Sequence, residues 1–146
     1  MNRKYWIVVA SKDQVEQGVA NGFVQAVHGH VEPLTRMKAG DKVLFYSSKL
    51  TQDGEEKYQY FTAVGEIADN RIVQVSAGNG FKPFRRRAFF KRCRNISILP
   101  LISELSFIKN KTKWGMPFRF GTLEIPERDF LLISKQMGSI PELEAA

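Results

Sequence analysis

A series of short apolar segments, each bounded by turn-forming residues, constrains the fold of this 146-residue chain most strongly. Residues 5–10 (YWIVVA) are apolar on both faces of a strand, which predicts a buried central strand. Gly and Asp turns, such as Gly40-Asp41 and Asp53-Gly54, separate the later segments. Strands are expected at 5–10, 43–46, 58–67, 72–75, 85–94 and 120–125, and short helices at 12–20, 33–37, 98–105 and 126–137.

Short turns link most of these strands, which indicates an α+β fold built on a mixed β-barrel or curved sheet of five to six strands with short packed helices. In the expected strand 58–67, alternation places Tyr60, Thr62 and Val64 on one face and Phe61, Ala63 and Ile67 on the other. We expect one domain over residues 1–146, with a core at about 4–137 and a tail at 138–146.

The cysteine content and hydropathy narrow the class of protein. Cys93 is the only cysteine, which excludes an intrachain disulfide and argues against a cysteine-rich zinc site. The apolar run at 5–10 is too short for a membrane span or the core of a signal peptide. We therefore expect a soluble, cytoplasmic protein, without membrane contact and monomeric.

The net charge of +7 is concentrated in one segment. Residues 82–94 hold seven of the 22 Lys and Arg residues and no acid, and residues 109–119 add four more cations. Such clustering is typical of a phosphate-binding surface, although edge strands also carry cations that block aggregation. The arginine triplet at 85–87 favours phosphate, because the guanidinium fork matches phosphate oxygens. The predicted phosphate-binding residues are Lys12, Arg36, Arg85, Arg86, Arg87, Lys91, Arg92, Lys113 and Arg119.

Five blocks of the sequence, in the same order, resemble the EVE domain family. They are residues 5–11 (YWIVVAS), 22–29 (GFVQAVHG), 33–47 (PLTRMKAGDKVLFYS), 83–87 (PFRRR) and 114–119 (WGMPFR). The resemblance spans residues 4–137 and implies a PUA-like fold related to the YTH readers of methylated adenine. It further implies that a modified base in DNA or RNA binds in an aromatic-walled pocket, with no metal or organic cofactor.

A reader of this kind must unstack a base at a cost of a few kcal/mol, and stacking on an aromatic ring returns about 1–3 kcal/mol. Trp114 lies in a polar loop among lysines, so we predict that it stacks on the base, with a half-buried lid over the barrel as the alternative. Trp6 lies in the buried strand, where core packing also explains it. YTH readers use several tryptophans, so the further walls are expected from Phe118, Phe45 or Tyr46.

Polar residues at strand ends are the candidates for reading the base edge. Ser11 and Ser47 each end a strand, although helix capping explains Ser11 and loop initiation explains Ser47 equally well. His28 and the amide of Gly29 are predicted to contact a base or phosphate, with a structural loop as the alternative. Two histidines without a third ligand do not form a zinc site, so no metal is expected.

Three functions fit these features to different degrees. A non-enzymatic reader of a modified base, such as methylated or hydroxymethylated cytosine or methylated adenine, agrees best with the resemblance. A PUA-type binder of structured RNA would use the same basic surface without a modified base. A small nuclease or hydrolase, as in the related ASCH group, would need clustered catalytic residues, and the sequence has no such constellation.

Overall fold

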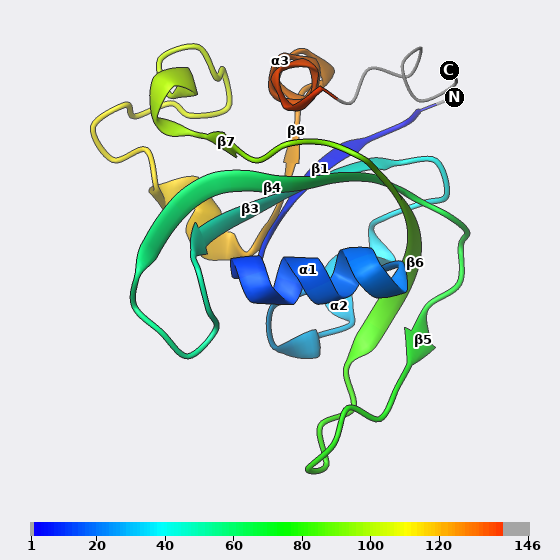
Figure 1. Ribbon diagram of the computed structural model, residues 1–146. Helices are drawn as coiled ribbons and strands as arrows, with labels where there is room; N and C mark the ends of the chain where they lie inside the picture. The colour runs from blue at the N-terminus through cyan, green and yellow to red at the C-terminus, as the bar shows by residue number, and fades with distance from the viewer. Residues whose placement is uncertain (1, 139–146) are drawn as a thin grey trace.

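The computed structural model describes residues 2–138, so that only Gly138 of the predicted tail falls within it. One curved sheet forms the centre of this part of the chain, with helices against both of its faces (Figure 1). Its strands are β1 (Tyr5–Val9), β2 (Phe23–Val24), β3 (Lys42–Lys49), β4 (Lys57–Ile67), β5 (Val73–Gln74), β6 (Phe84–Lys91), β7 (Ile96–Ser97) and β8 (Thr122–Ile125).

The sheet is mixed because β1 has two neighbours of opposite direction. Trp6 of β1 pairs with Val43 of the parallel strand β3 and with Glu124 of the antiparallel strand β8. The order along the sheet is β2-β6-β4-β3-β1-β8, with β5 beside β6 and β7 beside β4. These other pairs are antiparallel. The predicted α+β class and the mixed, curved sheet are confirmed, and the first strand is buried between β3 and β8. Within the described residues the sheet has eight strands where five to six were predicted, because the two-residue strands β2 and β7 were not expected.

A parallel pair requires a crossover connection, and residues 10–41 supply it between β1 and β3. This connection contains α1 (Lys12–Asn21), β2, the 3-10 turn η1 (Val27–Gly29) and α2 (Glu32–Thr35). The helix α1 begins after Ser11, as predicted, and ends at Gly22, whose φ of 73° lies in the left-handed region that favours glycine. The segment expected as an ordered loop after α1 therefore also contributes a strand, β2, to the sheet edge.

The C-terminal part of the chain contains the 3-10 turns η2 (Leu99–Leu101) and η3 (Met116–Phe120), followed by the helix α3 (Glu127–Met137). The predicted helix at 98–105 forms only as the 3-10 turn η2, with Leu101 N–H donating to Ile98 C=O at 2.9 Å, followed by a turn in which Leu105 N–H donates to Leu101 C=O at 3.1 Å. The predicted last helix is confirmed, with Pro126 immediately before it.

Side-chain alternation divides the core into two clusters on opposite faces of the sheet. The α3 cluster contains Ile7, Leu44 and Tyr46 from β1 and β3, together with Phe130 and Ile133 from α3. The α1 cluster contains Trp6, Val8, Val43 and Phe45, which alternate with these residues on the same strands, together with Val15 of α1 and Leu34 of α2. Successive residues of β1 and of β3 therefore contribute alternately to the two clusters.

A β-bulge corrects the faces predicted for β4. Tyr46 pairs with Phe61, whereas the preceding Phe45 pairs with Ala63, so the register shifts at Thr62. Phe61 consequently faces the α3 cluster with Val64, and Ala63 faces the α1 cluster. Strict alternation had placed Phe61 and Ala63 together, which is wrong because the bulge adds one residue to β4 between these pairs.

Candidate nucleic-acid interface

A cavity of about 600 Å³ opens between α1, β2 and the strand ends beside them. Three phenylalanine rings belong to its wall, namely Phe23, Phe45 and Phe81. The polar side chains that also line it are Asp13, Gln14, Gln17, Gln25, His28, Lys49, Gln52, Asp53 and Arg85. Aromatic rings among a larger set of hydrogen-bonding groups suit a small, flat, polar ligand.

Arg85 of β6 joins two residues of the cavity wall. Its Nε donates a hydrogen bond to Oε1 of Gln25 at 2.8 Å. Its guanidinium carbon lies 3.8 Å from the centroid of the Phe23 ring, in a cation–π contact. Burial lowers the pKa of Arg85, but a guanidinium remains charged at neutral pH. Arg85 therefore braces the β2 side of the cavity as well as carrying charge there.

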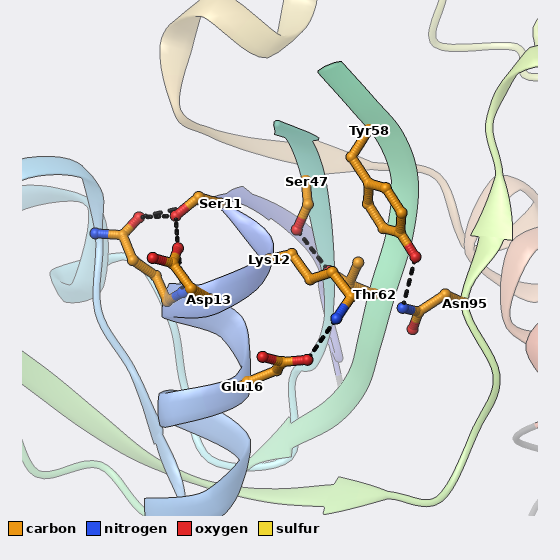
Figure 2. A network of polar contacts seen from close by, with 9 residues as sticks. Ser11, Lys12, Asp13, Glu16, Ser47, Tyr58, Thr62 and Asn95 are labelled. Carbon is orange, nitrogen blue, oxygen red and sulfur yellow. Dashed lines mark hydrogen bonds and ion pairs between the residues drawn. The ribbon is translucent and has the colours of Figure 1, made fainter. Parts of the chain in front are cut away.

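The first turn of α1 forms a second polar side of the cavity (Figure 2). The Ser11 hydroxyl lies within hydrogen-bonding distance of Asp13 Oδ1 and of Gln14 Oε1, and its backbone N–H donates to Gln14 Oε1 at 3.3 Å. Burial tends to raise the pKa of Asp13, but hydrogen bonds from Ser11 and from the backbone of Gln14 and Gln52 hold that pKa below its usual value. Asp13 is thus a carboxylate at neutral pH. Ser11 is the N-cap residue of α1.

The loop around η1 brings His28 to the cavity, as the sequence predicts. His28 has a φ of 57°, which is unusual for a residue with a side chain, and its ring lies 5.7 Å from that of His30. The amide of Gly29, predicted to contact the ligand, instead donates to Ala26 C=O at 2.8 Å. A Cβ on Gly29 would lie 2.5 Å from Cβ of Pro83, so close packing explains this glycine.

The aromatic pocket predicted from the sequence does not form as one site. Phe45 lines the cavity, but Tyr46 and Phe118 are buried in the α3 cluster on the other face of the sheet. Their rings stack with centroids 4.4 Å apart. Trp114 is half-buried and packs edge-on against Phe118 at 6.4 Å. Tyr46 lies on the opposite face from Phe45 because β3 alternates, and Phe118 and Trp114 pack on that face with it. The alternative of a half-buried Trp114 describes its position better.

Two further residues predicted to line the pocket, Trp6 and Ser47, are buried and hydrogen-bonded to other residues of the protein interior. Trp6 is 1% exposed, and its Nε1 donates to Asp41 Oδ2 at 3.0 Å. Asp41 also accepts the backbone N–H groups of Lys4 and Lys38 at 3.0 Å each, so this carboxylate ties the start of β1 to the turn before β3. Ser47 is fully buried, and its hydroxyl is hydrogen-bonded to Thr62 at the bulge, 2.8 Å away (Figure 2).

Arg86 requires a correction, because it was predicted to bind phosphate and is only 1% exposed. Its Nη1 donates to the carbonyl oxygens of Leu34 and Met37 at 2.7 and 2.6 Å, and its Nη2 donates to that of Asp69 at 2.6 Å. Desolvation lowers the pKa of Arg86, opposed by the charges of Asp69 and Asp41. Arg86 fastens the end of α2 to β6, and it faces the α1 cluster because β6 alternates.

The other predicted phosphate ligands differ in their surroundings. Arg87 is 66% exposed, with Asp69 at 3.9 Å, and Lys91 ends the same strand. Lys12 pairs with Glu16 at 2.6 Å (Figure 2), and Arg36 lies over the Trp6 ring at 5.6 Å. The remaining three, Arg92, Lys113 and Arg119, have exposed side chains.

Sequence reasoning missed several residues of the cavity wall, chiefly Phe23, Gln25 and Phe81. An available signal was the alternation of Phe23 and Gln25 around Val24, which is typical of a short strand with one buried face. Phe81 follows the turn at Gly78–Gly80 and carried no periodic signal. Within residues 2–138, no three His, Cys, Asp or Glu side chains are grouped so that they could hold a metal ion. None of the described helices has the length and apolar character needed to cross a membrane.

Comparison with known proteins gives relatives and structural neighbours for this fold. A UPF0310 protein from the gntR 5' region of Bacillus licheniformis is 52% identical over 130 residues, which cover 89% of this chain and 88% of that protein. A UPF0310 protein of Mycolicibacterium vanbaalenii is 41% identical over 90% of this chain and 91% of its own length.

Among solved structures, the YTH domain of the Zygosaccharomyces rouxii MRB1 protein, in complex with N6-methyladenosine RNA, has a similar fold. Its TM-score is 0.61 at 15% identity, over 93% of this chain and 87% of that chain. A Rhodopseudomonas palustris protein solved by NMR has a TM-score of 0.59 at 17% identity, over 92% of this chain and 93% of that chain. The EVE domain model matches residues 4–136, and the chain therefore belongs to the EVE domain family.

Proposed function

We propose that this protein is a non-enzymatic reader that binds one modified base of a nucleic acid in the cavity beside α1. The observation that carries this proposal is the cavity of about 600 Å³, where the rings of Phe23, Phe45 and Phe81 meet hydrogen-bonding side chains from α1 and from the residues after β2, such as Gln25. Its volume falls within the range of about 300–1,000 Å³ that is usual for small-ligand sites. A methylated or hydroxymethylated cytosine or a methylated adenine is the expected kind of ligand.

The chemistry of the wall favours a base over a phosphate group inside the cavity. Asp13 and Asp53 line it along with the cations Lys49 and Arg85, so the wall has no excess of positive charge to hold a phosphate. The same carboxylates can accept hydrogen bonds from an exocyclic amino group, and the phenylalanine rings can stack on a base. Phosphates would instead meet Arg87 of β6, which is 66% exposed and pairs with Phe23 of the cavity wall.

The structural neighbours support a ligand of this class. The MRB1 YTH domain, whose fold resembles this one, was solved with N6-methyladenosine RNA, and the Pho92 YTH domain was solved with m6A. The tryptophans of this chain lie outside the cavity, Trp6 in the α1 cluster and Trp114 against the α3 cluster. We therefore expect a phenylalanine-walled pocket whose preferred base need not be methylated adenine.

A fluorescence-polarisation panel tests the proposal. Short DNA and RNA oligonucleotides would differ at one position only, carrying plain, methylated or hydroxymethylated cytosine, or plain or methylated adenine. We expect selective binding of one modified base, and we expect Phe81→Ala to remove the selectivity, since Phe81 is a 44% exposed part of the wall. Phe120→Ala is the matched control, because Phe120 is 81% exposed and does not line this cavity.

Two other outcomes would contradict the proposal in different ways. Equal affinity for every oligonucleotide would indicate a binder of nucleic-acid shape or charge, as in the structured-RNA alternative. Absence of binding to all of them would remove nucleic acid as the partner.

A further inference from the structure

The outward face of β6 combines cations with an exposed aromatic ring. Arg86 and Ala88 are buried, and Phe90 packs against the α1 cluster, so these three residues face the interior. By alternation, Arg85, Arg87, Phe89 and Lys91 share the opposite face, which we call the β6 track. Arg87 is 66% exposed and Phe89 is 63% exposed, so the centre of the β6 track faces solvent.

The β6 track is continuous with the cavity. Arg85, its first residue, lines the cavity and contacts Phe23 and Gln25. Arg87, the second, pairs directly with Phe23 of β2. Successive residues of the track lie about 6.6 Å apart along the strand, which is close to the length of one nucleotide in an extended single strand. A single-stranded nucleic acid that leaves the cavity along β6 can therefore contact one residue of the β6 track per nucleotide.

Phe89 distinguishes this face from an edge strand that is simply protected by charge. Arg and Lys on a strand discourage aggregation, but a largely exposed phenylalanine among them works against that purpose. A phenylalanine between cations is the combination that binds single-stranded nucleic acid, since bases stack on the ring and phosphates meet the cations. Two acids beside the β6 track are partly neutralised, because Glu66, opposite Phe89, pairs with Lys42 at 2.7 Å and Asp69 lies 3.9 Å from Arg87.

We propose that the β6 track binds the single-stranded segment directly beside the base held in the cavity. Phe89 stacks on one flanking base, and Arg87 and Lys91 contact the phosphates on either side of it. This inference rests on the proposed function and makes it more specific. A base that stacks on Phe89 has given up its own base pair, so the ligand is single-stranded at the read base and on one side of it.

The experiment uses the full chain and the oligonucleotide that binds best in the panel of modified cytosines and adenines. Phe89→Ala is expected to weaken binding of the single strand by about tenfold, in line with the loss of one base–aromatic stack. Phe89→Trp should restore or strengthen it. Phe120→Ala, which removes another exposed phenylalanine, should leave the affinity unchanged.

Truncation of the ligand makes the test specific to flanking nucleotides. Removing the nucleotides on one side of the modified base should weaken binding to the wild-type protein about as much as the Phe89→Ala substitution does. The same truncation should have little further effect on binding to the Phe89→Ala variant. A fully paired duplex with the same modified base should bind at least tenfold more weakly than the single strand.

Equal affinity for duplex and single strand would overturn the inference, and so would a Phe89→Ala variant that binds with wild-type affinity. Neither result would contradict the proposal that the cavity binds a modified base. If no oligonucleotide binds the wild-type protein, the proposed function fails too, so the two failures are distinguishable.

Discussion

Arg85 Nε donates a hydrogen bond to Gln25 Oε1 across 2.8 Å, and this contact determines the orientation of the glutamine amide. A guanidinium has donors and no acceptor, so the amide oxygen must face Arg85 and the NH₂ group must point elsewhere. Since Gln25 lines the cavity, it offers a hydrogen-bond donor to a ligand there. The cavity then contains both a fixed donor, Gln25, which follows β2, and a carboxylate acceptor, Asp13, from α1.

The first prediction concerns this donor. Gln25→Glu keeps the contact with Arg85 but replaces the NH₂ group by an oxygen, which would face an acceptor of the base. We expect a loss of affinity of about tenfold or more, because a buried acceptor would lose its partner. Gln25→Met, which has no charge, should lose a similar amount in oligonucleotide titrations. A loss confined to Gln25→Glu would show that charge repulsion is responsible and that the donor is not used.

The second prediction separates Arg85 from Arg87 by salt dependence. Arg87→Ala should lower the slope of log affinity against log salt by about 1, as expected when one phosphate contact is removed. Arg85→Ala should mainly reduce the discrimination between modified and plain bases, because Gln25 is no longer oriented. Both variants would be titrated against the same oligonucleotides at several salt concentrations. An equal change in slope with unchanged discrimination would make Arg85 an ordinary phosphate contact.

The third prediction concerns stability. Arg86→Met should lower the free energy of unfolding by about 3 kcal/mol, because three backbone carbonyls lose their buried donor. Arg87→Ala, one residue along and exposed, should change it by less than about 0.5 kcal/mol. Urea denaturation followed by circular dichroism measures both values. A stable Arg86→Met protein with weakened binding to all oligonucleotides would restore the phosphate role that burial argues against.

The fourth prediction concerns Trp114. Because its ring packs against Phe118 at the α3 cluster, Trp114→Ala should cost about 2 kcal/mol of stability, less than the 3–5 kcal/mol of a fully buried aromatic. Base discrimination should persist in the folded variant. Denaturation and the oligonucleotide panel together provide the measurement. If Trp114→Ala had wild-type stability but no longer discriminated between modified and plain bases, Trp114 would be part of the base-binding site.

The strands were largely predictable from the sequence because their apolar residues and turns are local signals. Residues 5–10 predict β1, and the long run at 58–67 predicts β4, each within one residue at either end. The partners of a side chain were less predictable. Phe45 and Tyr46 are neighbours in sequence, yet one lines the cavity and the other stacks on Phe118 beyond the sheet. Which face is which depends on long-range packing.

The candidate site was only partly predictable for the same reason. His28 was predicted to contact a base or phosphate and Arg85 to bind phosphate, and both line the cavity. Arg86 could not be separated from its neighbours by charge, because its burial depends on carbonyl groups supplied by α2 and by Asp69. The bulge at Thr62 left no local signal, although it decides the face on which Phe61 lies.

The crossover between β1 and β3 has a consequence for how binding preference can change. More than half of the residues around the cavity come from this one connection, residues 10–41, including Asp13, Phe23 and Gln25. The central strands supply mostly its floor, through Val9 and Phe45. Substitutions or length changes within a single stretch of the gene can therefore alter ligand preference while the central strands β1, β3 and β4, which lie outside it, keep their register. Exchanging this stretch between relatives is accordingly a direct way to transfer ligand preference from one protein to another.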